Sequence, residues 1–355
     1  MKKSMIALSV ASVFLFGCTS SDDSNNTVGF VAPETVVDTS DWGTRPEATG
    51  LTSEEFIWSE GMDFAANLVK VNGLNTFNTP SIASVNNQIL TTPNVNVLYT
   101  AAIVDTTGGF TLNLPVDNSR LVTAQIINLD THTTPVHLTK GGEYTFSSEK
   151  FDNHVGILVR IGVEDNADAE EQIDVISNEL SVTATNANPL PSYDLDKLLA
   201  TRTALKQEFA KSPMDSSGGM VETTYKIADW EKYTLISAAG WGLSAEERAS
   251  YKLIPGPKDL ECSTVTFEGP VVDTNANGFY SLTIYGKDMF LMADESNTIK
   301  GDETGQIEVT VGPKECKEGA ENYLYAAKPW NIVLRAYEPE IEAFMNLPTA
   351  TVVTQ

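Results

Sequence analysis

The chain has 355 residues, of which 41% are apolar and 20% charged, an ordinary composition for a folded protein that excludes wholesale disorder. At this length more than one hydrophobic core is expected, so we predict two domains. Forty-eight acidic residues against 23 basic ones give a formal net charge of −25. A field of that sign repels phosphate backbones, so nucleic acid is disfavoured as a partner.

The N-terminus has the proportions of a secretory signal peptide. Lys2 and Lys3 form a positive segment, and the apolar run at residues 5–16 is too short to span a bilayer of about 30 Å as a helix. The run ends in Leu-Phe-Gly-Cys at residues 15–18, which resembles the lipobox of bacterial lipoproteins. This resemblance implies cleavage before Cys18, acylation of its thiol by a palmitate-type chain, and acylation of the new N-terminus. Thr19, in place of an aspartate, favours passage to the outer membrane.

The segment after Cys18 is predicted to be a tether. Residues 19–26 are small and polar and lack any periodicity, as in a flexible linker. We therefore predict a signal peptide over residues 1–17 and a lipidated tether over residues 18–50. The protein would be anchored by lipid in the outer membrane and face the periplasm.

Export also affects the remaining two cysteines. Cys262 and Cys316 form an even pair in an oxidising compartment, and we predict a disulfide between them. Closing a loop of about 50 residues stabilises a chain by about 3–4 kcal/mol in the chain-entropy account. A metal site is the alternative, although neither cysteine has a histidine or a second thiol close in sequence.

The first half reads as one helix followed by short strands. Thr52 to Glu55 match a capping box, and apolar residues at helical spacing predict a helix over residues 53–71. Another helix is predicted over residues 168–180. Strands are predicted at residues 95–104, 110–114, 121–129, 144–146 and 156–161.

A turn-rich stretch at residues 186–191 marks the predicted domain boundary. It divides an N-terminal β-rich domain (51–188) from a helical connector and a C-terminal β-rich domain (189–355). An amphipathic helix is predicted over residues 195–209, and a second capping box at residues 244–247 predicts another through residue 253. Strands are predicted at residues 263–267, 279–285, 306–311 and 331–336. The fold class is mainly β with α (α+β): two sandwich-like β-rich domains with a few covering helices.

The strand at residues 279–285 has two different faces. Because side chains alternate along a strand, Tyr280, Leu282 and Ile284 share an apolar face. The opposite face carries hydroxyls and rings, from Phe279, Ser281, Thr283 and Tyr285. The first face needs a core to cover it, whereas the second can meet water or a ligand.

Both halves resemble families of unknown role. The second half carries residues 240–242 (Gly-Trp-Gly), Glu246, Ala249, Tyr251, residues 278–285, Asn322, Pro329, Trp330 and residues 334–339 (Leu-Arg-Ala-Tyr-Glu-Pro). In this order they resemble the bacterial domain of unknown function numbered twelve-fourteen. The first half carries residues 93–99 (Pro-Asn-Val-Asn-Val-Leu-Tyr), Asp105, Arg160, Asp165 and Gln172. These resemble its usual N-terminal companion, domain twelve-fifty-four. The resemblance implies a β-rich, often exported two-domain protein, but no established reaction.

Arg335 and Tyr337 form the strongest polar group, because they share a strand face and belong to the family pattern. If their strand pairs with residues 279–285, the guanidinium approaches Ser281, Thr283 and Tyr285. An arginine in that place suits a carboxylate or a hydroxylated ligand. A similar group in the first domain comprises Tyr99, Asp105 and Arg160. The alternative for both groups is structural: an ion pair with Asp or Glu, or a tyrosine hydroxyl bonded to the backbone.

Two weaker metal patterns remain. Asp130, His132 and His137 carry ligand chemistry that suits Zn²⁺, with His154 as a further candidate, but a hydrated loop is the favoured interpretation. Residues 273–278 imitate a calcium loop, but Ile284 stands where the bidentate acid belongs, and an Asn-Gly turn is simpler.

From these observations we predict an envelope lipoprotein that binds a small polar molecule, with no cofactor required. One alternative is a periplasmic enzyme, hydrolytic or isomerising, that uses His132, Asp130 and a metal. Another is an envelope-scaffolding protein without a ligand.

Overall fold

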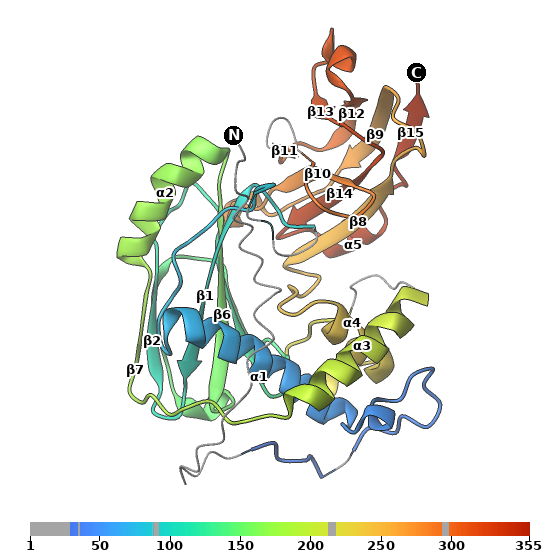
Figure 1. The fold of residues 1–355 in the computed structure, drawn as a ribbon. Helices are drawn as coiled ribbons and strands as arrows, with labels where there is room; N and C mark the ends of the chain where they lie inside the picture. Colours follow the sequence, from blue (N-terminus) through green and yellow to red (C-terminus); the bar gives the residue numbers. More distant parts are fainter. Residues whose placement is uncertain (1–28, 35, 87, 89–91, 212–217, 293–297) are drawn as a thin grey trace, which may run out of the picture.

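The computed structural model describes residues 29–34, 36–86, 88, 92–211, 218–292 and 298–355. The predicted signal peptide and the predicted lipid site, Cys18, therefore lie outside the described residues. None of the helices within the described ranges has both the length and the apolar character needed to cross a membrane. The chain is arranged as an N-terminal sandwich, a helical layer and a C-terminal sandwich (Figure 1).

The N-terminal sandwich has two antiparallel sheets. The first has the order β1 (Val97–Asp105), β6 (His154–Gly162), β3 (Val122–Asn128), β4 (Val136–Leu138). The second has the order β5 (Gly142–Phe146), β2 (Phe110–Leu114), β7 (Ser181–Ala184). Their inner faces share one core, to which Leu98, Leu112 and Ile157 contribute. Helix α2 (Asn166–Glu179) packs Ala169 and Ile176 against this core.

The C-terminal sandwich also has two sheets, of four strands each, which are antiparallel except where β13 pairs with β12. One has the order β11 (Thr298–Gly301), β10 (Tyr280–Gly286), β14 (Trp330–Tyr337), β8 (Ala249–Pro255). The other has the order β13 (Tyr323–Tyr325), β12 (Gly305–Gly312), β9 (Ser263–Gly269), β15 (Thr351–Thr354). Leu282, Val309 and Trp330 lie in its core, and the short helix α5 (Ile341–Met345) adds Phe344.

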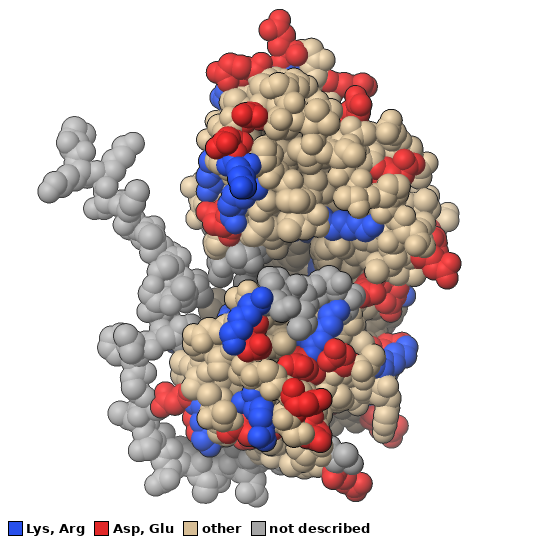
Figure 2. Space-filling view, turned by 90° about the vertical axis from the view of Figure 1, so that its right-hand side faces the viewer, with Lys and Arg blue, Asp and Glu red and all other residues tan. Residues whose placement is uncertain are grey.

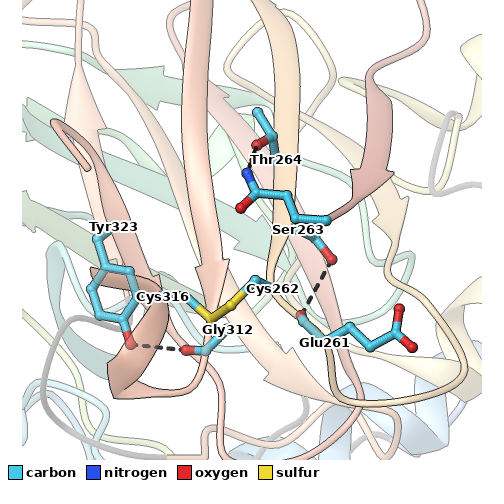
Figure 3. The surroundings of a disulfide bond; sticks show 8 residues. Glu261, Cys262, Ser263, Thr264, Gly312, Cys316 and Tyr323 are labelled. Atoms are coloured by element: carbon cyan, nitrogen blue, oxygen red, sulfur yellow. Dashed lines mark hydrogen bonds between the residues drawn. A yellow bond between two sulfur atoms is a disulfide. The ribbon is translucent and has the colours of Figure 1, made fainter. Parts of the chain in front are cut away.

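The predicted disulfide joins Cys262, just before β9, to Cys316 in the short helix after β12 (Figure 3). The two Cα atoms lie 5.6 Å apart, and the bond closes a loop of 54 residues. Gly312 makes room for it, because a Cβ there would lie 2.5 Å from the Cys316 Sγ. The disulfide prediction is confirmed.

Three helices form a layer that lies beside the lower part of the N-terminal sandwich and below the C-terminal one in Figure 1: α1 (Ser53–Asn72), α3 (Leu195–Lys211) and α4 (Trp230–Ala239). Phe56, Leu198 and Tyr233 meet in a third core between them. Gly61 lets α1 approach the end of β3 closely, since a Cβ would lie 2.1 Å from the Leu129 carbonyl oxygen. The helical layer thus contains α1 from before the predicted boundary at residue 188 and α3 and α4 from after it.

The α+β fold class is confirmed, and so is the two-faced strand: Tyr280, Leu282 and Ile284 lie in the sandwich core. The helix predicted from residues 244–247 is wrong. Residues from Ala249 onward instead form β8, which pairs with β14 along its whole length. A capping box is a local signal, and here the pairing energy of a four-stranded sheet outweighs it.

Charge is spread unevenly over the surface that Figure 2 shows. Acidic and basic side chains alternate over the lower part, whereas the C-terminal sandwich above it presents a broad uncharged area (Figure 2). No single-sign patch dominates this face.

Candidate functional site

The outer faces of β1-β6-β3-β4 and of β11-β10-β14-β8 pack against one another. Val97 and Leu121 of the first sheet contact Ala249, Phe279 and Tyr337 of the second in one apolar cluster. Tyr99 and Tyr251 pack on its edge. The polar residues that share these faces are therefore enclosed between the two sandwiches.

Arg335 lies on the enclosed face of β14, as the strand pairing predicted. It is opposite Ser281 on β10 and opposite Tyr251 on β8. Its guanidinium carbon lies 5.9 Å from the centre of the Tyr251 ring and 5.6 Å from that of Tyr285, within cation–π range. The arginine is thus sandwiched by aromatic rings.

The Arg335 guanidinium is only partly satisfied by hydrogen bonds. The residue is 3% exposed. Nη2 donates to the Thr92 carbonyl oxygen, while Nη1 is buried with no hydrogen-bond partner among the described residues. Burial tends to lower the pKa of Arg335, but the surrounding phenols raise it overall, so the group stays charged. A buried cation without a counter-ion is costly and needs an explanation.

Hydroxyl groups are positioned around this arginine by Asn94, which is fully buried. Its Nδ2 donates to the Tyr337 Oη at 3.1 Å and to the Ser281 Oγ at 3.3 Å. Because both hydroxyl oxygens act as acceptors here, their protons are directed elsewhere. Tyr285 donates its own proton to the Pro93 carbonyl at 2.6 Å.

The four tyrosines of this cluster are neutral at ordinary pH. Burial raises the pKa of Tyr99, Tyr251, Tyr285 and Tyr337, and the nearby guanidinium groups offset only part of that effect. The phenols are therefore hydrogen-bonding groups and do not supply the counter-charge for an arginine.

A second buried arginine faces this cluster from the N-terminal sandwich. Arg160 lies opposite Tyr99 across β6 and β1 and is 6% exposed. Its Nη1 donates to the Gln125 Oε1 at 2.8 Å, and its Nη2 donates to the Gly242 carbonyl at 3.0 Å. Both partners are neutral. Within the described ranges, neither Arg160 nor Arg335 is paired with a carboxylate, in contrast to Arg120, Arg202 and Arg248.

His137 and Glu338 extend the site on the Arg160 side. His137 lies opposite Gln125, the partner of Arg160, and its Nε2 is 3.8 Å from the Glu338 Oε1. Among the described residues, neither His137 ring nitrogen has a hydrogen-bond partner, nor does the Glu338 Oε1, while the Glu338 Oε2 accepts from the Arg248 Nη1 at 2.7 Å. Burial, together with Arg160 and Arg248, lowers the pKa of His137 to about 3, so the ring is neutral.

Most of the predicted ligand residues meet here, but Asp105 does not. It lies at the far end of β1, where its carboxylate accepts from Thr107 and Asn188. Thr283 shares the face of Ser281, and its hydroxyl lies 3.4 Å from that of Thr298 and also contacts the Tyr285 hydroxyl. Asp105 is therefore a structural residue, because backbone and amide donors already satisfy it.

The predicted metal residues are not brought together. His132 is fully buried, its Nδ1 lies 3.0 Å from the Ser237 Oγ, and its Nε2 accepts from the Gly242 backbone at 3.0 Å. Both of its nitrogens are thus occupied. Across the described part of the chain, no three His, Cys, Asp or Glu side chains are placed to hold a metal ion. His137 belongs to the arginine site, and residues 273–278 form a turn in which Asp273 accepts from the backbone of Asn275.

A separate hollow of about 1200 Å³ lies beside α1 and α4. Trp58, Trp230 and Phe30 line it together with Asp130 and His154. It shares no residue with the arginine site.

Comparison with known proteins agrees with the fold. Residues 263–341 match the family described as "Protein of unknown function (DUF1214)". No curated protein matches the sequence significantly. The VPA0106 protein of Vibrio parahaemolyticus is similar in structure, with a TM-score of 0.64 and 16% identity over 87% of this chain and 99% of that chain. An uncharacterised protein from Burkholderia cenocepacia has a TM-score of 0.48 and 16% identity, over 84% of this chain and 87% of that chain.

The site also contains residues that sequence reasoning did not assign to it. Asn94, Tyr251 and Glu338 were visible as parts of the two family patterns, but their roles were not. Gln125 and His137 carried no such signal, because only the pairing of β3 with β4 and β6 brings them to Arg160.

Proposed function

We propose that this chain binds a small anionic molecule between its two sandwiches, with Arg335 as the anchor. The observation that carries the proposal is the buried Nη1 of Arg335, which has no partner and no carboxylate paired to its charge within the described residues. Desolvating an unpaired charge costs several kcal/mol, and a bound anion removes most of that cost. A guanidinium fork is well matched to a carboxylate.

The chemistry around Arg335 fits this ligand. Ser281 accepts a hydrogen bond from Asn94, so its proton can be donated to an anion, whereas Tyr337, which also accepts from Asn94, is hydrogen-bonded to Tyr99 as well. Their phenolic and aliphatic hydroxyls are neutral donors that add selectivity without competing charge. In the part of the chain that the structure describes, the site is therefore a set of donors with no carboxylate paired to Arg335.

Calorimetric titration of the full chain with acetate at constant ionic strength tests the proposal. We expect saturable binding to the wild type and none to Arg335→Met. The matched control is Arg45→Met, which removes a surface arginine that is 54% exposed and should leave binding unchanged. Equal binding by wild type and Arg335→Met would show that the anchor is elsewhere.

We also propose that the protein is an outer-membrane lipoprotein facing the periplasm, and that its first half is related to domain twelve-fifty-four. The lipobox at residues 15–18 and the family pattern from Pro93 to Gln172 support these two statements. Metabolic labelling with a palmitate analogue tests the first: wild-type protein should be labelled and Cys18→Ser should not. Labelling of Cys18→Ser would refute the lipid site.

An enzymatic role is the second candidate, and the pair of His137 and Glu338 favours it. A neutral imidazole whose nitrogens have no partner among the described residues, beside a buried carboxylate, is suited to moving a proton. If the pair acts on a bound carboxylic acid, an adjacent C–H should exchange with D₂O in the presence of wild type and not of His137→Asn. Absence of exchange with wild type would leave the binding function alone.

A further inference from the structure

The second arginine bears on the class of ligand. Arg160 resembles Arg335 in three respects: it is buried, it sits opposite a tyrosine on the neighbouring strand, and its hydrogen bonds go to neutral groups. Arg160 comes from the N-terminal sandwich and Arg335 from the C-terminal one. The interface therefore encloses two positive charges, one from each side.

The groups between the two arginines do not neutralise them. Tyr99, Tyr251 and Tyr337 each lie within electrostatic range of both guanidinium groups, yet burial keeps the phenols protonated. Glu338 is already paired with Arg248. Of the described acids near the site, none is left to balance either charge.

We propose that the ligand is a small dicarboxylic acid, with one carboxylate on Arg335, the other on Arg160, and the tyrosine hydroxyls along its length. This rests on the proposed function, since it takes Arg335 as an anion anchor. A dianion neutralises both buried charges at once, whereas a monoanion leaves one of them unbalanced. Because the arginines come from different sandwiches, such a ligand also ties the two together.

The orientation of the donors supports this class. On the Arg335 side, Nη1 has no partner among the described residues and the Ser281 proton can be donated, while the Tyr337 hydroxyl is shared with Tyr99. On the Arg160 side, Gln125 holds the guanidinium and the neutral ring of His137 lies next to it. Each end thus offers hydrogen-bond donors beside a positive charge, which suits a ligand with an acid at each end.

The test needs only wild-type protein in its first arm. The full chain is titrated calorimetrically with acetate, phosphate, succinate, glutarate, adipate and monomethyl succinate, all at one ionic strength. We expect the best-fitting dicarboxylate to bind about tenfold or more tightly than acetate. If succinate is the best fit, its monomethyl ester, of the same length with one charge fewer, should lose that advantage.

The second arm uses Arg160→Gln, which removes the positive charge and keeps a shorter, neutral side chain with an amide donor. It should reduce dicarboxylate affinity about tenfold and leave acetate affinity unchanged, while Arg335→Met abolishes both. If Arg160→Gln does not fold, the wild-type titrations decide the question. They compare the affinity for the dicarboxylates with the affinities for acetate and for the monomethyl ester.

The outcomes separate the two proposals. Acetate binding as tightly as every dicarboxylate, with Arg160→Gln unaffected, overturns the diacid and keeps the anion site. Phosphate binding more tightly than any dicarboxylate overturns the diacid in favour of a phosphate ligand. Failure of all six probes contradicts the proposed function itself.

Discussion

Tyr251 lies directly across the strand pair from Arg335, and its ring centre is 5.9 Å from the guanidinium carbon. The same arrangement recurs in the facing sheet, where Tyr99 lies opposite Arg160. Cross-strand neighbours on one face of a sheet are held about 5 Å apart by the backbone, so these pairs are fixed by the fold. The two sandwiches thus present matching tyrosine–arginine pairs to the interface.

The unpaired charge of Arg335 predicts an unusual stability effect. Arg335→Met should leave the free energy of unfolding unchanged or raise it by about 1–2 kcal/mol, because it removes a desolvated charge while retaining an apolar stem. Urea unfolding measures this. A loss of 3 kcal/mol or more would mean that the arginine acts as a structural group, contrary to its assignment as a ligand anchor.

Asn94 is expected to be important for the interface. Asn94→Ala removes both of its donated bonds and leaves the Tyr337 and Ser281 oxygens buried, so stability should fall by about 1–3 kcal/mol. Asn113→Ala is the matched control, because the side-chain bond that Asn113 makes within the described ranges joins it to Ser181 on the exposed surface. Equal effects in the two variants would contradict the assignment.

Arg202 joins α3 to α1 through two acids. Its Nε and Nη2 donate to Glu60 at 2.6 and 2.8 Å, and Nη2 also donates to Asp63 at 2.6 Å. Arg202→Ala should cost about 3–5 kcal/mol, because two largely buried carboxylates lose their counter-ion. Arg202→Ala combined with Glu60→Gln and Asp63→Asn should recover part of the loss. No recovery would show that the cost comes from packing alone.

The disulfide should stabilise the C-terminal sandwich against unfolding. In the chain-entropy account, closing its loop is worth about 4 kcal/mol, so Cys262→Ser with Cys316→Ser should lower the melting temperature clearly. Reductant should lower the melting temperature of wild type toward that of the double variant and leave the variant unchanged. A wild type insensitive to reductant would contradict this expectation.

Asp152 should make stability depend on pH near neutrality. Burial, with Asp130 close by, raises the pKa of Asp152 from 3.8 to about 7 in the folded chain. Between pH 3.8 and about 7, the Asp152 carboxyl is protonated in the folded state and ionised in the unfolded state. The stability that this group contributes is therefore complete at low pH and is lost as the pH rises through about 7. Asp152→Asn should therefore be more stable than wild type by about 1–3 kcal/mol at pH 8, with no gain at pH 4.

Asp117 is the control for this prediction, because its pKa is shifted in the opposite direction from that of Asp152. Burial acts to raise its pKa, but bonds from Ser119 and Arg120 outweigh it and lower the pKa overall. Asp117→Asn should therefore destabilise the chain at pH 8, because the charged form is favoured in the folded state. If Asp152→Asn were also destabilising at pH 8, the raised pKa of Asp152 would be contradicted.

Much of the fold could be predicted because it follows from local sequence patterns such as strand alternation and helix capping. The alternation in residues 279–285 fixed which side chains enter the core, and Thr52 caps α1 as its sequence suggested. Helix α4 went unpredicted because almost all of it is buried, so it lacks the polar face that gives a helix its period. Strand β8 went unpredicted because pairing with β14 overrides its local signal.

The residues of the site also fall into those that local sequence patterns predict and those that only long-range packing brings together. Arg335, Tyr337 and Ser281 could be grouped from strand alternation and a supposed pairing, and their pairing is confirmed. Asp105 was misplaced because residues on one strand can share a face and still lie at opposite ends of it. The facing of Arg160 and Arg335, and the approach of His137 to Glu338, depend on how two sandwiches pack, for which no local sequence signal exists.

The most direct test of the central claim observes the Arg335 guanidinium itself. The ¹⁵N–¹H signals of arginine side chains are recorded while the full chain is titrated with succinate, and Arg335→Met identifies the signal of interest. The account predicts that the Arg335 signals shift saturably while those of Arg45 stay in place. Saturable binding of succinate that leaves the Arg335 signals unmoved would contradict it.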